Sequence, residues 1–297
     1  MSSAAHRAGH VAIVGRPNVG KSTLLNSLVG QKISITSRKP QTTRQRVTGI
    51  LTRDDAQLVF IDTPGFQTRH TSALNRLMNR CVTSGLRGVD VIIWVVEALK
   101  FDARDAALGR LLPAGTPVVL VANKVDRVRD KGRLLPFIKD FTERFDCAAI
   151  VPVSAQKQEN LGRLIDAVVE LLPEAPRIFE ADEITTSSER FFAAELVREQ
   201  LFRLLGEELP YSTAVEIERF EADGRLRRIH AAVLVDRESQ KAIVIGRKGE
   251  KLKVIGTAAR KQMEEMFGGK VFLEIWVKVK SGWADSDAAL KHLGYDA

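Results

Sequence analysis

The chain has 297 residues, of which 44% are hydrophobic and 28% are charged. This composition excludes a disordered or fibrous protein, and the length favours two globular domains. Two widely separated cysteines exclude a disulfide scaffold or a cysteine-rich metal site. The longest apolar run, residues 89–96, is only strand-sized, and residues 1–10 contain no apolar signal core. We therefore expect a cytoplasmic protein with free thiols.

The net charge of +8 is distributed unevenly. Residues 1–180 carry 26 Lys and Arg against 17 Asp and Glu, whereas residues 181–297 carry 19 against 20. Within the second part, seven Lys and Arg and a single acidic residue, Glu250, lie between Lys241 and Lys261. A local basic stripe favours a nucleic-acid site, although a solvated helix face has the same composition.

The first motif follows an apolar, strand-like run at residues 11–14 and consists of Gly15, Arg16, Pro17, Asn18, Val19, Gly20, Lys21, Ser22 and Thr23. A glycine, four free positions and Gly-Lys-Ser between a strand and a helix predict a phosphate-binding loop. Backbone N–H groups and the helix N-terminus would bind phosphates. Lys21 would reach the β- and γ-phosphates, and Ser22 would ligate Mg²⁺. The alternative, a glycine turn beside a surface lysine, does not explain the strand–loop–helix order.

Two further motifs offer contacts to magnesium and to a γ-phosphate. The polar, basic composition of residues 31–46 predicts an exposed loop. The hydroxyl of Thr42 or Thr43 in this loop would complete the coordination shell of magnesium. A strand predicted at residues 57–61 ends in Asp62, Thr63, Pro64 and Gly65. Asp62 would hold magnesium through water, and Gly65 would offer its N–H to the γ-phosphate. Each pattern alone is common in strands and turns; their order after the phosphate loop supports the site.

A base-binding motif follows the strand predicted at residues 117–121. Its Asp126 carboxylate can accept hydrogen bonds from the N1–H and 2-amino group of guanine, which adenine lacks, so GTP and GDP are the predicted ligands. Lys124 would cover the purine ring with its stem, and Asn123 would tie the loops together. The backbone of Ser154 and Ala155 would meet the guanine carbonyl. These ordered motifs resemble those of the translation-factor-like GTPase superfamily.

Strand-like runs alternate with helical patterns over residues 10–173. This alternation predicts an α/β fold with right-handed crossovers, a mostly parallel sheet, and a site at the carboxyl ends of its strands. After a proline-containing stretch without periodicity, the pattern changes to a helix, two strands, a glycine loop between two helices, and a strand. This second pattern predicts a separate α+β domain.

The glycine loop of the second domain resembles that of the RNA-binding KH module in its prokaryotic arrangement. Glycines let the backbone approach sugar-phosphate, and basic side chains meet phosphates. The candidate RNA-binding residues are Ile245, Gly246, Arg247, Lys248, Gly249, Lys251 and Lys253. Apolar residues at positions 243, 245, 252 and 255 could line a floor under the bases or fill the core.

Both motif sets, with Gln-Thr-Thr-Arg at residues 41–44, Leu-Pro-Tyr-Ser at 209–212 and the segment 276–285, resemble the Era family of bacterial ribosome-assembly GTPases. The resemblance implies a monomer that uses Mg²⁺, hydrolyses GTP, binds small-subunit ribosomal RNA near its 3′ end and assists assembly of the small ribosomal subunit. The expected organisation is a disordered N-terminus at 1–9, a GTPase domain at 10–173, a linker at 174–188 and a KH-containing domain at 189–297.

The alternative function is a membrane-associated GTPase in growth or cell-cycle control, with peripheral contact to the inner face of the cell membrane and RNA binding secondary. The lack of a lipidation motif and of an aromatic-rich basic amphipathic helix argues against it.

Many regulatory GTPases carry a glutamine after the glycine of the Asp-x-x-Gly motif, where this chain has Phe66. Phenylalanine cannot orient water, so we expect slow hydrolysis unless another group or ion contributes charge. Asn18 resembles the asparagine with which related GTPases recruit K⁺. The candidate catalytic residues are therefore Asn18, Lys21, Thr42, Thr43 and Gly65.

Overall fold

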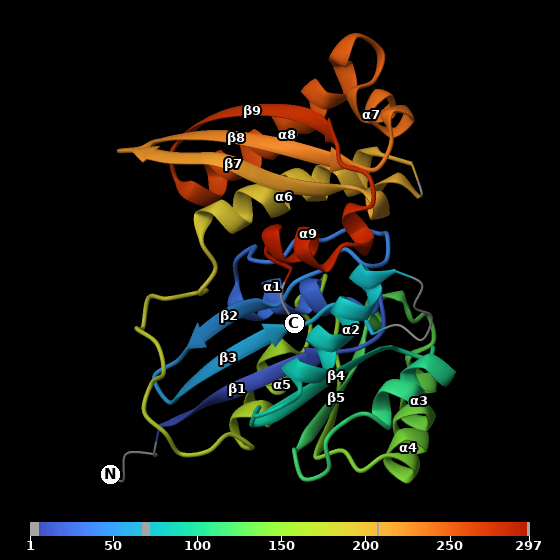
Figure 1. Ribbon diagram of the computed structural model, residues 1–297. Coiled ribbons are helices and arrows are strands. Elements are labelled where there is room, and N and C mark those ends of the chain that lie inside the picture. Colours follow the sequence, from blue (N-terminus) through green and yellow to red (C-terminus); the bar gives the residue numbers. More distant parts are fainter. Residues whose placement is uncertain (1–5, 67–71, 207, 296–297) are drawn as a thin grey trace.

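The computed structural model describes residues 6–66, 72–206 and 208–295, and it shows two bodies joined at a waist (Figure 1). The first domain contains β1 Arg7–Val14, α1 Lys21–Val29, β2 Val47–Thr52, β3 Ala56–Asp62, α2 Ala73–Gly85, β4 Val91–Glu97, α3 Ala103–Gly109, β5 Val118–Asn123, α4 Leu134–Arg144, β6 Ala149–Pro152 and α5 Leu161–Val169. The second contains α6 Glu189–Leu204, β7 Ala214–Asp223, β8 Leu226–Val235, α7 Glu238–Ile245, α8 Glu250–Phe267, β9 Lys270–Val279 and α9 Asp287–His292.

The sheet of the first domain has the strand order β2-β3-β1-β4-β5-β6. The pairs from β3 through β6 are parallel, and only the edge strand β2 runs antiparallel to its neighbour. Helices α1 and α5 cover one face, and α2, α3 and α4 cover the other. Because both faces are covered, the central strands are nearly continuous apolar runs. The predicted mostly parallel sheet is confirmed.

The N-terminal boundary differs from our expectation, because residues 7–9 belong to β1. Ala8 pairs with Gln57 of β3, and Gly9 is so tightly enclosed that a Cβ there would lie 2.5 Å from the Asp90 carboxylate. The Arg7 side chain adds a hydrogen bond of 2.6 Å to the carbonyl of Leu172. Sheet pairing and this contact hold residues whose composition alone suggested disorder; residues 1–5 lie outside the described part.

The segment 174–188, predicted as a linker, lies against the edge of the first sheet. The buried side chain of Gln57 accepts hydrogen bonds from the N–H groups of Ile178 (2.7 Å) and Phe179 (2.9 Å). The N–H of Ile50 donates to the carbonyl of Ile184 at 2.8 Å. The connection between the domains is therefore held by specific backbone contacts.

The second domain has a three-stranded sheet in the order β7-β8-β9, antiparallel then parallel. Helices α6 and α8 pack on one face. On the other face an apolar cluster joins Trp283 and Leu290 to Leu74 at the start of α2. Helix α9, which we did not predict, thus lies between the two domains (Figure 1). Within the described residues, no helix is both long and apolar enough to cross a membrane.

Candidate nucleotide site and nucleic-acid groove

The phosphate-loop residues lead from the end of β1 into α1, as the sequence predicted. A Cβ at Gly15 would lie 2.5 Å from the carbonyl oxygen of Val95. Gly20 has a φ of +101°, and a Cβ there would lie 2.4 Å from Nδ2 of Asn123. Both positions therefore require glycine for packing inside the protein, in addition to the close approach of phosphate.

Lys21 places its ammonium group inside this loop. Nζ donates hydrogen bonds to the carbonyls of Gly15 (3.0 Å) and Arg16 (3.2 Å). Burial lowers the pKa of Lys21 to about 8, although the nearby Asp62 carboxylate opposes this shift. The positive charge is thus held at the position where β- and γ-phosphates would bind.

Hydroxyl and carboxylate oxygens gather beside the start of α1. The Ser22 hydroxyl lies 2.7 Å from the Thr43 hydroxyl and 2.7 Å from Oδ2 of Asp62. Ser34, which sequence reasoning missed, donates to the same carboxylate oxygen at 3.1 Å. Burial raises the pKa of Asp62, and its Oδ1 is buried without a hydrogen-bond partner among the described residues. A hard divalent cation prefers such oxygens, so the cluster fits Mg²⁺.

The two candidate threonines have different surroundings. The Thr42 hydroxyl binds the Ser37 hydroxyl (2.8 Å) and the Lys39 carbonyl (2.9 Å), whereas the Thr43 hydroxyl faces Ser22.

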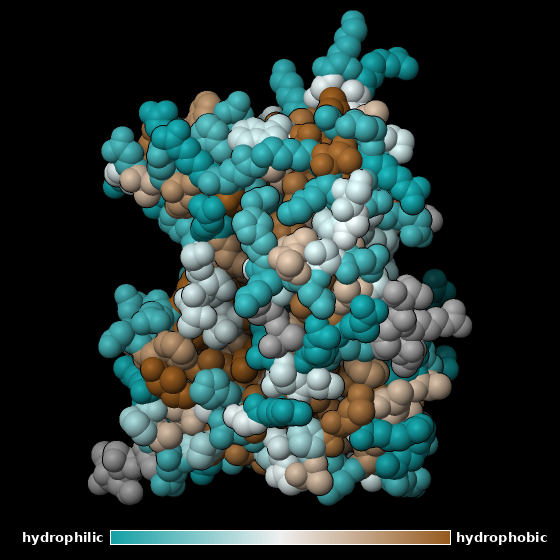
Figure 2. Space-filling model, viewed as in Figure 1, coloured by the Kyte–Doolittle hydropathy of each residue, from teal (hydrophilic) through white to brown (hydrophobic). Residues whose placement is uncertain are grey.

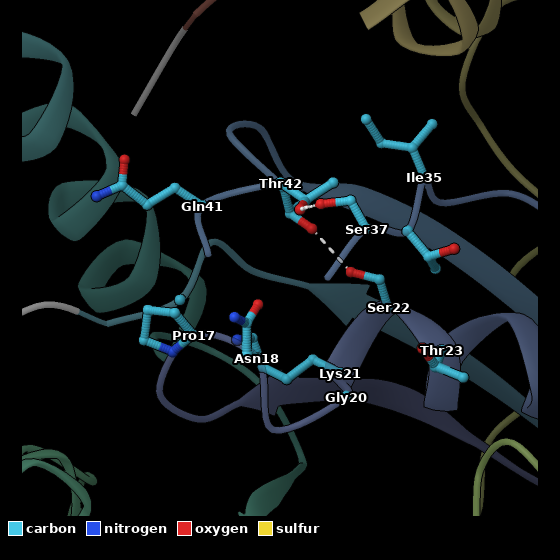
Figure 3. A pocket seen from close by; sticks show the side chains of 13 residues that line it. Pro17, Asn18, Gly20, Lys21, Ser22, Thr23, Ile35, Ser37, Gln41 and Thr42 are labelled. Atoms are coloured by element: carbon cyan, nitrogen blue, oxygen red, sulfur yellow. Dashed lines mark hydrogen bonds between the residues drawn. The ribbon is translucent and has the colours of Figure 1, made fainter. Parts of the chain in front are cut away.

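A small cavity of about 60 Å³ lies between the phosphate loop and the loop 31–46. It is lined by Pro17, Asn18, Gly20, Lys21, Ser22, Thr23, Ile35, Thr36, Ser37, Gln41, Thr42, Thr43 and Gly65. Figure 3 shows Ser37 and Thr42 on one side of this cavity and the phosphate loop on the other.

The base-binding motif forms a connected network at the end of β5. Asn123 donates to the carbonyl of Val19 (2.9 Å) and accepts from the N–H of Ala155 (3.1 Å), so it ties the phosphate loop to the last base-binding segment. The hydroxyl of Ser154 donates to Oδ1 of Asp126 at 2.6 Å. We had expected only the backbone of Ser154 to act; its side chain orients the carboxylate.

A cavity of about 1110 Å³ connects the base motif to the phosphate loop. It is lined by Asn18, Gly20, Thr23, Thr36, Ser37, Arg38, Lys39, Asn123, Lys124, Asp126, Arg127, Ala155, Gln156, Phe202 and Arg203. Phe202 and Arg203 belong to α6, so the second domain forms part of the wall. Lys124 places Nζ 2.5 Å from the carbonyl of Asn18 and 2.7 Å from Glu97, a partner that the sequence did not indicate.

The other predicted residues frame the phosphate loop. Arg16 forms ion pairs with Asp102 and with the fully buried Asp105, both at 3.1 Å. Thr63 donates to a carbonyl of β1, and Gly65 lies so close to Pro17 that a Cβ would be 2.8 Å away. Phe66, which follows Gly65, packs against the apolar core on the α2 face. Its ring is therefore unable to orient water; residues 67–71 lie outside the described part.

The glycine loop of the second domain lies between α7 and α8 and exposes its basic residues. Gly246, Lys248 and Gly249 all have positive φ angles, of +74°, +52° and +80°. Arg247 and Lys248 are exposed. Figure 2 shows hydrophilic side chains projecting from the end of the molecule where α7 lies. The backbone and two cationic groups are thus presented together to an approaching phosphate chain.

A groove of about 290 Å³ runs beside this loop, between α8 and β9. It is lined by Gly249, Leu252, Lys253, Gly256, Thr257, Arg260, Leu273 and Ile275. The apolar floor that we suggested under the bases is therefore only partly found. Leu252 lines the groove, whereas Ile255 is fully buried and Ile243 is about half exposed outside the groove. The alternation of β9 and the glycine inside α8 were the available signals for the missed residues.

Comparison with known proteins agrees with both sites. Residues 10–124 match the family described as 50S ribosome-binding GTPase, and residues 208–284 match the KH domain. GTPase Era of Nitrosomonas eutropha is 57% identical over 296 residues and covers 100% of both chains. GTPase Era of Stenotrophomonas maltophilia strain K279a is 57% identical over 292 residues, 98% of each chain.

Two solved structures match at a TM-score of 0.94 and 38% identity, each covering 98% of this chain and 100% of the other. One is Era in complex with MgGDPNP and nucleotides 1506–1542 of 16S ribosomal RNA; the other is a variant of Aquifex aeolicus Era bound to GDP and AlF₄⁻. The predicted KH-like second domain is confirmed. Since the similarity extends over the full length and includes both the guanine-nucleotide pocket and the KH groove, the chain belongs to the Era family of GTPases.

Proposed function

We propose that the protein is a GTP-hydrolysing switch that binds small-subunit ribosomal RNA near its 3′ end and assists assembly of the small ribosomal subunit. The main support for this proposal is that one chain contains both a guanine-nucleotide pocket and an exposed KH groove. In addition, the second domain lines part of the nucleotide pocket. The Era structure solved with MgGDPNP and nucleotides 1506–1542 of 16S ribosomal RNA supports this assignment, because its fold matches over 98% of this chain.

Crosslinking to total cellular RNA, with and without a non-hydrolysable GTP analogue, tests this proposal. We expect the 3′ end of the small-subunit RNA to be enriched among the crosslinked RNA. A synthetic RNA of that sequence should then bind the protein in a gel-shift assay. Arg247→Ala or Lys248→Ala should each lower affinity and reduce the slope against log salt by about one. Flotation with anionic liposomes is the parallel arm: vesicle binding without RNA enrichment would replace this proposal by the membrane-associated alternative.

For hydrolysis, the chain supplies positive charge and fixed oxygens around the phosphates. Lys21 and the N–H groups at the start of α1 would meet the β- and γ-phosphate oxygens. Ser22, Thr43 and Asp62 would hold Mg²⁺, directly or through water. The Ser22 hydroxyl lies 2.7 Å from each of the other two groups, and Oδ1 of Asp62 has no hydrogen-bond partner among the described residues. Bound Mg²⁺ supplies neutralisation of the charge on those phosphates. Thr43→Ala should therefore reduce kcat more than GDP affinity.

Phe66 stands where many GTPases have a glutamine that orients the attacking water, so this chain lacks that contribution to hydrolysis. We propose that a bound monovalent cation compensates by adding positive charge beside the phosphates. Asn18 lies in the left-handed region (φ +64°), and its side-chain NH₂ group donates a hydrogen bond of 3.0 Å to the carbonyl of Arg38 in the loop 31–46, which leaves the amide oxygen for a ligand. K⁺ bound between the Asn18 amide oxygen and loop carbonyls would add positive charge beside the phosphates.

Steady-state GTPase assays in potassium and sodium salts at matched ionic strength test this role. We expect faster hydrolysis in potassium, and loss of that response in Asn18→Ala with GTP binding preserved. Equal rates in the two salts for the parent protein would eliminate the cation and leave RNA or a protein partner as the source of the missing charge.

A further inference from the structure

The loop 31–46 sends one arginine side chain deep into the second domain. Arg44 is 1% exposed. Its guanidinium donates to three main-chain carbonyls, those of Thr213 (2.7 Å), Pro210 (3.0 Å) and Tyr211 (3.2 Å). These three oxygens, called here the carbonyl cradle, come from the short turn that leads into β7. The side chain is therefore fixed to the second domain although its backbone belongs to the nucleotide-sensing loop.

Aromatic rings enclose the faces of the same guanidinium. The Cζ atom of Arg44 lies 5.6 Å from the ring centre of Phe202 and 5.9 Å from that of Trp283. The Tyr295 hydroxyl lies 3.5 Å from Nη1. Planar faces on rings and N–H edges on carbonyls suit guanidinium, and an ammonium group cannot reproduce this arrangement.

The net free energy of docking Arg44 is small, because favourable and unfavourable contributions largely cancel. The hydrogen-bond partners of Arg44 in the described part of the chain are all uncharged, and burial is the main cause that lowers its pKa. The cost of removing a charge from water therefore offsets much of the gain from hydrogen bonds and stacking. A contact of this kind is stable only in the correct geometry, whereas a leucine at this position would favour burial in any arrangement.

Three other residues of the loop are also held by the second domain. Glu199 of α6, which is fully buried, accepts hydrogen bonds from the N–H of Thr36 (3.0 Å) and from Lys32 (2.5 Å). Lys39 donates to the carbonyl of Leu205 at the end of α6 (2.5 Å). The loop is thus attached to the second domain along most of its length.

We propose that Arg44 is a positioning residue for GTP hydrolysis: docked in the carbonyl cradle, it holds the adjacent Thr43 hydroxyl beside Ser22 and Asp62. Consecutive Cα atoms are separated by a fixed distance of about 3.8 Å, so a shift of Arg44 displaces Thr43 as well. The second domain thereby sets the catalytic competence of the first. Docking that strengthens the binding of Mg²⁺ and a γ-phosphate at Thr43 is strengthened by those ligands in turn, because coupling between binding free energies is reciprocal.

The inference rests on the proposed role of Thr43 as a magnesium ligand, and the experiment uses the full chain. In Arg44→Ala, kcat should fall on the order of 10²-fold, as expected for a displaced catalytic ligand. The affinity for a fluorescent GDP should stay at the parent value, because GDP has no γ-phosphate for the loop to meet. The Mg²⁺ concentration giving half-maximal hydrolysis should rise.

Arg46→Ala is the matched control. Arg46 lies in the same loop, but its guanidinium contacts the Cys81 carbonyl and the Ser84 hydroxyl within the first domain. This variant should keep the parent kcat and magnesium dependence. Arg44→Lys should be intermediate. Free guanidinium ion can occupy the carbonyl cradle but is not joined to Thr43, so it should leave the kcat of Arg44→Ala low; recovery of the parent kcat would contradict the positioning role.

Trp283→Leu tests the cradle from the second domain. It should reproduce the magnesium effect. Combining it with Arg44→Ala should add little to that effect, since both changes remove the same stacking contact; the loss of the Trp283 contact with α2 should appear separately, as a lower stability in a denaturant melt. Parent-like kcat in Arg44→Ala, or equal losses of GDP and GTP-analogue binding in Arg44→Lys, would overturn the proposal. If Thr43→Ala keeps the parent kcat, the magnesium assignment itself fails; if only Thr43→Ala is impaired, the positioning role alone fails.

Discussion

The change Asp126→Asn tests the base specificity at constant side-chain size. In the structure, Oδ1 of Asp126 accepts a hydrogen bond of 2.6 Å from the Ser154 hydroxyl, and the carboxylate lines the large cavity. The carboxylate is thus oriented with acceptor capacity left for a ligand. An amide at this position would turn an NH₂ group toward the N1–H and 2-amino donors of guanine.

The expected loss follows from two charge-assisted hydrogen bonds. Each is worth about 1.5–3 kcal/mol, so removing both should weaken GTP and GDP binding roughly 10²- to 10⁴-fold. Xanthine presents an oxygen where guanine has its 2-amino group, so the NH₂ group of the variant regains a partner. The variant should therefore prefer xanthosine triphosphate over GTP.

Competition of GTP, ATP and xanthosine triphosphate against a fluorescent nucleotide measures this change. Asp130→Asn is the control, because Asp130 is an exposed acidic residue of the following turn that caps Gly132 and lies outside the cavity lining. It should bind GTP like the parent. Parent-like GTP affinity in Asp126→Asn, or no gain for xanthosine triphosphate, would refute the assignment.

Three further outcomes follow from the geometry. Gly20→Ala should abolish nucleotide binding in a GDP titration because its Cβ would meet an amide nitrogen 2.4 Å away, whereas Gly30→Ala, with φ +76° and open space, should only lose about 1–2 kcal/mol in a denaturant melt. Gly246→Asp should abolish the RNA gel shift and leave GTPase activity, whereas Gly268→Asp, which adds the same charge at an open turn, should leave both. GDP affinity should be highest near pH 7 and fall up to about tenfold per pH unit above about 8, where Lys21 loses its proton; constant affinity from about pH 7 to about pH 9 would contradict this.

The nucleotide motifs were predictable because their geometry is largely local. Gly15 to Ser22 are consecutive, and a strand before them and a helix after them determine the loop. Asp62 reaches Ser22 because β1 and β3 are parallel neighbours whose carboxyl ends meet at one edge. The sequence could not choose between Thr42 and Thr43, because adjacent loop residues have no periodicity to distinguish their directions.

Contacts between distant segments were not predictable. Residues 31–46 look like an exposed loop by composition, yet Arg44 and Thr43 are buried because the turn before β7 and the phosphate loop enclose them. Likewise, Glu199 has the charge of a solvent-exposed helix position, but α6 lies between its own sheet and the first domain. In both cases tertiary packing determines whether the side chain is buried, and this cannot be predicted from the residue types of the segment alone.

The interface between the domains combines two kinds of contact at the segments that a γ-phosphate would reach. One is the loop 31–46, which is attached by hydrogen bonds and by Arg44. The other is α2, which follows the Asp62–Gly65 motif in the chain; its N-terminal Ala73 donates to Asp285 at 3.1 Å, beside an apolar cluster with Trp283. Apolar contacts tolerate small sliding, whereas hydrogen bonds to carbonyls and carboxylates are lost within an ångström. We therefore expect a shift at the phosphates to break the hydrogen bonds of the loop 31–46 before the apolar contacts between Trp283 and α2.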